Sequence, residues 1–262
     1  MKTRLDAELV RRGLARSRES ASELIESGNV LVSGIPANKA ATQVDAQISI
    51  TLKGEADEFV SRGGHKLSGA LDCFSSIILN KKTALDAGAS TGGFTDVLLK
   101  RGVNKVVAVD VGYGQLAWQL QKDPRVKILD RVNVRTLTPE QVGEEIDLVV
   151  ADLSFISLKL VLPALIAVAK QEADFLVMVK PQFEVGKEKL GAGGVVRDAH
   201  LRKEAVASVA DTAYSLGLGS LGVVASPLPG PSGNVEYFLW LHKGAPALLE
   251  VDLDLAIQKG PA

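Results

Sequence analysis

A glycine-rich stretch that begins with an acidic residue is the first place in this 262-residue sequence where residue types and spacing could do chemistry. Residues 85–95 read LDAGASTGGFT and follow a short apolar run that is typical of a buried strand. Ligands of parallel sheets bind at the carboxyl ends of strands, often at the first turn. The stretch lacks the G-x-G-x-x-G spacing and a lysine after its glycines, so it does not predict a phosphate-binding loop.

Two carboxylates near this stretch favour a ligand with positive charge. Asp86 stands close to where a pyrophosphate would otherwise sit, and it suits an amino acid moiety beside a sulfonium. Asp110 ends the next apolar run, where an acidic residue can accept both hydroxyls of a ribose. Gly88, Gly92 and Gly93 allow a ligand to approach the backbone closely. These residues predict S-adenosylmethionine as cofactor, with a glycine-rich turn and solvated aspartates as the open alternative.

A second set of charged residues is dispersed along the chain. Asp152 and Lys180 each close an apolar run, so both should lie at one edge of a parallel sheet, near the reactive methyl of the cofactor. Glu236 stands inside a predicted strand, and Lys66 precedes a predicted amphipathic helix. The plainer interpretations stay open: a surface salt bridge for the first pair, an exposed strand residue for Glu236 and a surface lysine for Lys66.

The elements that must position these residues alternate along the chain. Apolar runs rich in Val, Ile and Leu are separated mostly by helical stretches, and they predict a doubly wound, mostly parallel α/β sheet. These runs cover residues 83–86, 105–110, 126–130, 147–152 and 174–180. Two further strands are predicted over 220–226 and 234–241, joined by a Pro/Gly-rich connection.

The first fifty or so residues predict a small separate unit of two helices followed by a small sheet. Up to residue 18, six basic residues stand against two acidic ones, which gives this segment a net charge of +4 within a chain of net charge −1. The basic residues are Lys2, Arg4, Arg11, Arg12, Arg16 and Arg18. They form either a solvated helix surface or a face that contacts the phosphates of a nucleic acid.

Composition excludes several classes of protein. With 46% hydrophobic and 23% charged residues, the sequence is neither disordered nor a coiled coil. The single cysteine, Cys73, allows no intramolecular disulfide, which fits a reducing compartment. Three scattered histidines indicate no metal site. We find no signal peptide, and the longest apolar run, 160–169, is too short to span a membrane, so we expect a cytoplasmic protein with no membrane partner.

Six motifs resemble those of one known family over nearly the whole chain. They are VSRGGHKL at 60–67, DAGASTGGFT at 86–95, DVGYGQLA at 110–117, ADLSFISL at 151–158, KPQFE at 180–184 and GNVEYFLWL at 233–241. All are similar to the TlyA family, whose members are described as ribosomal RNA 2′-O-methyltransferases and also as haemolysins. The resemblance implies a Rossmann-like class I methyltransferase domain of the FtsJ/RrmJ type behind a small α+β RNA-binding domain of the ribosomal-protein S-four type.

From the resemblance we expect an RNA-binding domain at 1–53, a linker at 54–60, a methyltransferase domain at 61–245 and a C-terminal tail at 246–262. The implied catalytic tetrad is Lys66, Asp152, Lys180 and Glu236. The residues expected to contact S-adenosylmethionine are Asp86, Gly88, Ser90, Thr91, Gly92, Gly93, Phe94, Thr95, Asp110, Asn133 and Asp152. The basic residues of the first segment are expected to contact RNA.

The implied reaction is methyl transfer to a ribose 2′-hydroxyl, with cytidine as the family expectation, in ribosomal RNA of the large subunit. Small-subunit RNA stays open as a second substrate. Lys180, held by Asp152 and Glu236, would orient the hydroxyl, and its alternative role as proton acceptor is weaker because neighbouring carboxylates favour the charged ammonium. A membrane-active haemolysin and a non-catalytic RNA-binding module are the rival interpretations. The sequence does not indicate an oligomeric state.

Overall fold

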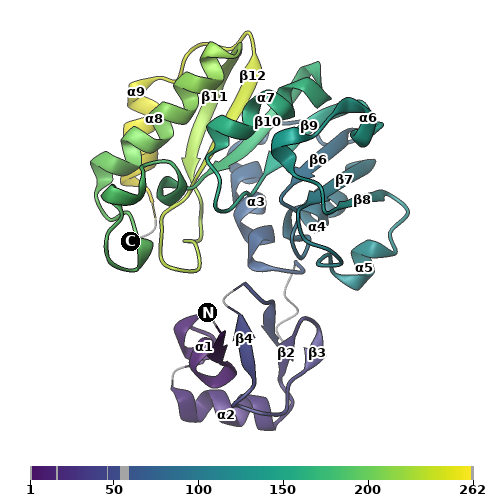
Figure 1. The fold of residues 1–262 in the computed structure, drawn as a ribbon, viewed down its shortest axis with the longest axis vertical. Coiled ribbons are helices and arrows are strands. Elements are labelled where there is room, and N and C mark those ends of the chain that lie inside the picture. The colour runs from purple at the N-terminus through teal and green to yellow at the C-terminus, as the bar shows by residue number, and fades with distance from the viewer. Residues whose placement is uncertain (1, 16, 46, 54–58, 261–262) are drawn as a thin grey trace. The chain divides into compact units, whose positions relative to one another are not determined.

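A computed structural model describes residues 2–15, 17–45, 47–53 and 59–260 of the chain. It divides into two compact units, Met1–Ser61 and Arg62–Ala262, and each is considered by itself (Figure 1).

The N-terminal unit packs two short helices on small antiparallel sheets. Helix α1 (Leu5–Arg11) and helix α2 (Arg18–Glu26) enclose a core of buried apolar side chains, because the apolar residues of each helix recur on one side. Ser17 caps α2 by accepting a hydrogen bond from the Ser20 amide, as its position before the helix predicts. The sheets consist of β2 (Val30–Val32) with β3 (Ile35–Pro36) and β5 (Ile50–Leu52), and of β1 (Lys2–Arg4) with β4 (Gln43–Asp45).

The C-terminal unit is built on one seven-stranded sheet with the order β11-β12-β10-β9-β6-β7-β8 (Figure 1). Strands β6 to β10 run parallel, and β11 and β12 complete the sheet in antiparallel pairing. The expected doubly wound, mostly parallel sheet is confirmed. The strands are β6 (Thr83–Ala87), β7 (Lys105–Asp110), β8 (Val126–Asp130), β9 (Ile146–Ala151), β10 (Ala169–Val179), β11 (Leu218–Ala225) and β12 (Tyr237–Lys243).

Helices cover both faces of this sheet, which explains why its strands read as continuous apolar runs. Alternate strand residues such as Leu85, Val107 and Val177 share one buried core with helices of one face, and the intervening strand residues turn to the other face. The first face carries α6 (Pro139–Val142), α7 (Leu158–Val168), α8 (Ala199–Ser215) and α9 (Glu250–Gln258), and the second carries α3 (Arg62–Cys73) and α4 (Gly93–Lys100). Helix α5 (Trp118–Gln121) contacts β8.

Three local expectations differ from the structure. Residues 246–262, expected to be a tail, contain helix α9, whose Leu253 and Ala256 are buried against the unit. Lys66 lies inside α3 rather than before a helix, because the helix already begins at Arg62. Glu236 stands one residue before β12, where its carbonyl accepts a hydrogen bond from the Ser226 amide. Within the linker expected at 54–60, residues 54–58 lie outside the described residues.

Candidate active site

Charged side chains terminate six neighbouring strands at one edge of the large sheet. Because β12 is antiparallel to β10, its beginning meets the carboxyl ends of the parallel strands, and the pairing of Val179 with Tyr237 places Lys180 opposite Glu236. Across the sheet, in spatial order from β12 to β8, these strand-end residues are Glu236, Lys180, Asp152, Asp86, Asp110 and Asp130. The fold thus gathers one lysine and five carboxylates at one edge.

Lys180 is held by the neighbouring strand end. Its Nζ lies 2.6 Å from Asp152 Oδ1 and donates a hydrogen bond of 3.0 Å to Ser154 Oγ. Pro181 follows directly and begins a short 3-10 helix, so the lysine stands at the point where the strand stops. The Lys180 and Asp152 side chains are 11% and 24% exposed, so this ion pair is only partly accessible to solvent.

Lys66 and Glu236 form a second, buried ion pair. Lys66 Nζ donates to Glu236 Oε2 at 2.5 Å, and the two side chains are 7% and 1% exposed. Glu236 Oε1 has no hydrogen-bond partner among the described residues. A Cβ at Gly230 would stand 2.7 Å from that oxygen, so a glycine there gives the carboxylate its room.

The four predicted catalytic residues are thus brought to one sheet edge, but their pairing differs from the expected one. We expected Lys180 to be held by both Asp152 and Glu236. In the structure Lys180 pairs with Asp152 and Ser154, and Glu236 pairs with Lys66 from α3. The site therefore consists of a partly exposed pair at the ends of β9 and β10 and a buried pair that joins α3 to the start of β12.

Asp86 is the buried carboxyl group of the site. Its Oδ2 accepts a hydrogen bond of 2.7 Å from Thr95 Oγ1 on α4, and its Oδ1 has no hydrogen-bond partner within the described part of the chain. Burial raises the pKa of Asp86 to about 7, and the charges of Asp152 and Asp110 also raise it, against the Thr95 hydrogen bond that lowers it. A buried carboxylate with a free oxygen and acidic neighbours suits a cationic group.

The loop after β6 folds tightly because its residues adopt conformations with positive φ. Gly88 has φ +85°, and a Cβ there would stand 2.6 Å from the Asp152 carbonyl oxygen. Gly92, with φ +94°, is the N-cap of α4. Asp110 binds the loop from β7, since its Oδ2 accepts from the Ser90 amide at 2.9 Å. The glycines thus let the loop pack closely against the ends of β7 and β9.

A cleft of about 320 Å³ lies beyond Asp110, at the ends of β7 and β8. Asp130 lines it and accepts a hydrogen bond of 3.0 Å from the Gly114 amide. Asp130 was not among the expected cofactor residues, although it closes a predicted strand just as Asp86 and Asp110 do. The other lining residues are Tyr113, Gly114, Leu116, Gln121 and Ile128.

Several expected cofactor contacts have structural roles in this unit. The Phe94 side chain is buried and packs against Phe238 with ring centroids 5.9 Å apart. Asn133 caps the short 3-10 helix Val134–Thr136, because its side chain accepts from the Arg135 amide. The Thr95 hydroxyl donates a hydrogen bond to the Asp86 carboxyl group. The Ser90 amide donates to Asp110, and the Thr91 carbonyl accepts the Ala117 amide. Gly93 is the first residue of α4.

Two aromatic residues next to the tetrad were missed by the motif reasoning. Phe155 follows Asp152 by three residues and Phe183 follows Lys180 by three, and their ring centroids are 5.2 Å apart. Phe155 is 81% exposed and has a φ of +65°, which is strained for a bulky side chain. The sequence does carry a signal for them: in ADLSF and in KPQF, a phenylalanine stands three residues after the charged residue that ends the strand.

Glu184 ties the same two loops together from inside. Its carboxylate accepts hydrogen bonds from Ser157 Oγ at 2.5 Å and from the Leu158 amide at 2.8 Å, at the start of α7. Burial raises the pKa of Glu184. The loops that carry Asp152 and Lys180 are therefore joined by an ion pair, a ring contact and a carboxylate cap.

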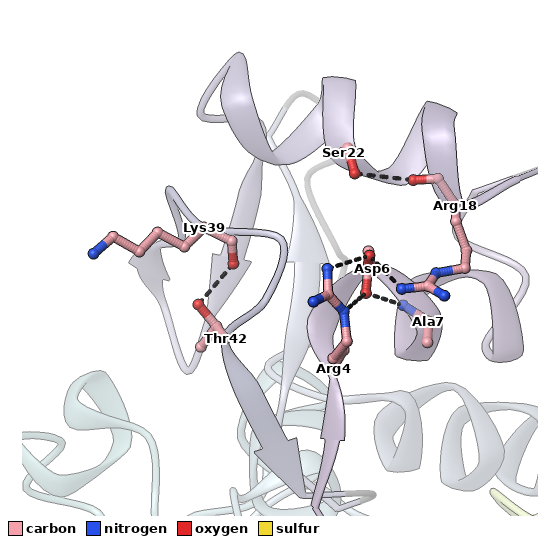
Figure 2. A network of polar contacts seen from close by, with 7 residues as sticks. All are labelled: Arg4, Asp6, Ala7, Arg18, Ser22, Lys39 and Thr42. Atoms are coloured by element: carbon pink, nitrogen blue, oxygen red, sulfur yellow. Dashed lines mark hydrogen bonds and ion pairs between the residues drawn. The ribbon is translucent and has the colours of Figure 1, made fainter.

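The basic residues of the N-terminal unit are paired with two buried acids. Arg4 and Arg18 donate to Asp6 (Figure 2), and Arg11 and Arg12 donate to Glu8. Arg12 also donates to the Ile48 carbonyl and its side chain is only 8% exposed, so this arginine serves the fold of the unit. Lys2 lies in β1. Arg16 lies outside the described residues.

The sheet order, the glycine loop after β6 and the acidic edge define a Rossmann-like α/β methyltransferase domain. Comparisons with known proteins agree. The FtsJ-like methyltransferase family model matches residues 59–243, and the S4 domain model matches residues 3–47. The chain belongs to the FtsJ-like methyltransferase family and, within it, to the TlyA proteins. The expected fold class, family and enzyme class are confirmed, and S-adenosylmethionine is the cofactor.

The similar proteins cover nearly the whole chain. One is the 16S/23S rRNA (cytidine-2′-O)-methyltransferase TlyA of Mycobacterium tuberculosis, 56% identical over 99% of both chains. Another is Hemolysin A of Brachyspira hyodysenteriae, 34% identical over 89% of this chain and 97% of that protein. A solved structure, a putative hemolysin from Streptococcus thermophilus, superposes with a TM-score of 0.83 at 35% identity and covers 98% of this chain and 95% of that one.

The residues of the site fit the cofactor. S-adenosylmethionine carries an ammonium and a sulfonium, and the free buried oxygen of Asp86 and the carboxylates beside it supply the matching charge. The glycine at 88 leaves room where a Cβ would meet backbone. Among the described residues, no helix is both long enough and apolar enough to cross a membrane.

Proposed function

We propose that this chain is a ribosomal RNA methyltransferase that transfers the methyl group of S-adenosylmethionine to a ribose 2′-hydroxyl of cytidine within a ribosomal subunit, in the cytoplasm. The observation that carries the proposal is the Lys180–Asp152 ion pair at 2.6 Å, which is partly exposed and lies on the same sheet edge as Asp86. The name of the Mycobacterium tuberculosis relative, which acts on 16S and 23S rRNA, supports the substrate and leaves both subunits as candidates.

Bound S-adenosylmethionine supplies an electrophilic methyl group on its sulfonium. The chain has to bring the nucleophile in line with that group, and positioning can contribute much of the acceleration. Lys180 is suited to this role because it donates hydrogen bonds but is itself fixed by Asp152 and Ser154. An ammonium in this place orients the lone pairs of the hydroxyl toward the methyl group, and the proton that the hydroxyl loses on methylation passes to water.

The buried pair has a different task in this proposal. Lys66 and Glu236 neutralise each other and link α3 to the start of β12, so they fix the floor of the site beside Lys180. Phe155 offers an exposed ring face to the base of the target nucleotide, because bases stack on aromatic side chains.

The decisive experiment compares two lysines of β10. Lys180 pairs with Asp152 at one end of the strand, and Lys170 pairs with Asp147 at the opposite edge of the sheet, at 3.1 Å. We expect Lys180→Ala to lower single-turnover methylation of ribosomal subunits by at least about a hundredfold with unchanged cofactor affinity. Lys170→Ala should stay near the wild-type rate.

The readout is transfer of a radiolabelled methyl group, followed by mapping of the 2′-O-methylated nucleotide in each ribosomal RNA. Near-normal turnover of Lys180→Ala would remove this lysine from the mechanism. A wild-type protein that binds S-adenosylmethionine and ribosomal subunits without any transfer would favour the non-catalytic RNA-binding alternative.

A further inference from the structure

One buried carboxylate organises the basic side chains of the N-terminal unit. Asp6 is the second residue of α1 and is 3% exposed. Its Oδ1 accepts from Arg4 Nε at 3.1 Å and from the Ala7 amide at 2.8 Å. Its Oδ2 accepts from Arg4 Nη2 and from Arg18 Nη2, both at 2.9 Å (Figure 2). All four acceptor positions of the carboxylate are therefore used.

The two arginines reach Asp6 from different elements and stay accessible. Arg4 ends β1, and Arg18 begins α2. Their side chains are 45% and 59% exposed although each guanidinium contacts a buried oxygen. A single carboxylate neutralises only one of two guanidinium charges, so the group keeps a net positive charge at the surface. The Arg4 hydrogen bond holds the pKa of Asp6 well below its usual range.

The backbone around this group is also fixed. The Leu5 amide donates to the Thr42 carbonyl and the Asp6 amide donates to the Ala40 carbonyl, at 2.8 and 3.1 Å. Ser22 Oγ donates to the Arg18 carbonyl on α2 at 3.0 Å. Lys39, in the adjoining turn, points away from Asp6 and is not held by it (Figure 2). The restraint thus applies to Arg4 and Arg18.

We infer that Asp6 is a positioning residue for RNA recognition, and that it holds Arg4 and Arg18 as a clamp for one phosphate of the RNA backbone. Guanidinium groups match the geometry of phosphate oxygens, and a side chain that is already restrained loses less freedom when it binds. The inference rests on the proposed function, because it takes ribosomal RNA as the ligand. Glu8 is different, since only one of its two partners, Arg11, is exposed and the other, Arg12, is 8% exposed.

The test uses a variant for which charge and positioning predict opposite changes in RNA affinity. Asp6→Asn adds one unit of positive charge to the unit, and charge alone would strengthen binding to RNA. If Asp6 positions the clamp, the same variant weakens binding despite the added charge. Glu19→Gln is the matched control, because Glu19 is an exposed neighbour of Arg18 on α2 and its replacement makes the same change of charge.

Binding of the full-length chain to purified large ribosomal subunits is measured over a series of salt concentrations. For Asp6→Asn we expect Kd to rise roughly tenfold, because Arg4 and Arg18 are no longer held together and their shared phosphate contact is lost. The slope of log Kd against log salt should also fall by about 0.7–0.9, which corresponds to one lost phosphate contact. Glu19→Gln should bind at least as tightly as the wild type with an undiminished slope.

The slope separates positioning from simple destabilisation. A variant that is partly unfolded binds more weakly by a factor that leaves the slope unchanged, and its thermal midpoint falls in parallel. Unchanged or tighter binding by Asp6→Asn, or weaker binding with the wild-type slope, would overturn the inference. The double variant Arg4→Gln/Arg18→Gln tests the clamp directly. If it binds RNA like the wild type, the two arginines hold no phosphate and the inference is wrong. The Lys180 experiment tests methyl transfer separately.

Discussion

Cofactor binding should release a proton from Asp86, and this makes the affinity for S-adenosylmethionine depend on pH around neutrality. Burial raises the pKa of Asp86 to about 7, so about half of the carboxyl groups are protonated at pH 7 in the free protein. A cationic ligand beside the free Oδ1 favours the ionised form. The perturbations to compare are a change of pH and Asp86→Asn.

The magnitude follows from linkage. If only the ionised carboxyl binds, the apparent Kd is multiplied by one plus the ratio of protonated to ionised Asp86. With a pKa of about 7, this factor is about 1.1 at pH 8 and about 11 at pH 6. The affinity should therefore weaken about tenfold as the pH falls from 8 to 6, and it should level off above the pKa.

Calorimetric titration at pH 6, 7 and 8 in two buffers of different ionisation enthalpy gives both the Kd and the number of protons released. We expect nearly one proton at pH 6 and about a tenth of one at pH 8. Asp86→Asn should bind more weakly and lose this dependence. Asp147→Asn, at the opposite edge of the sheet, should keep it. A wild-type Kd that is flat between pH 6 and 8 would refute the reasoning, and a dependence that survives in Asp86→Asn would assign it to another group.

Three further predictions concern residues at the site. Between pH 3.8 and about 7, Asp86 keeps its proton in the folded protein but has lost it in the unfolded chain. The free energy of unfolding, relative to that of Asp86→Asn, should therefore fall by up to about 4 kcal/mol as the pH rises through this window. Urea unfolding measures it. Phe155→Ala should lower kcat/KM on ribosomal subunits roughly 5- to 100-fold with unchanged cofactor Kd, and an equal loss of both would contradict a base contact. Glu236→Gln should lower the free energy of unfolding by about 3–5 kcal/mol, because it leaves the Lys66 ammonium buried without a counter-charge. The double variant Lys66→Met/Glu236→Leu should recover stability but not activity. Recovery of activity would remove the pair from the mechanism.

The sequence predicted the strands and their ends well, for a physical reason. Strands covered on both faces must be apolar throughout, so each polar residue that ends an apolar run marks the edge of the sheet. This placed Asp86, Asp110, Asp152 and Lys180 correctly at one edge. The same rule would have included Asp130.

Side-chain partners were less predictable, because they depend on packing between elements that are distant in sequence. The pairing of Lys66 with Glu236 requires α3 to lie under the start of β12, and 170 residues separate the two. Charge counting in the first segment likewise missed that Asp6 and Glu8 are buried and bind the arginines. A buried charge of this kind looks in sequence like a solvated one.

The order of charges along the sheet edge explains how one site can hold a cationic cofactor and a ribose hydroxyl together. Asp152, Asp86, Asp110 and Asp130 end four adjacent strands, β9, β6, β7 and β8, and attract a ligand of positive charge along that part of the edge. Lys180 ends β10, where the parallel strands meet the antiparallel β12. An electron-rich hydroxyl is favoured beside that ammonium, and a sulfonium is repelled from it. We therefore expect the hydroxyl and the methyl group to meet at the change of sign between β9 and β10, beside the Lys180–Asp152 pair.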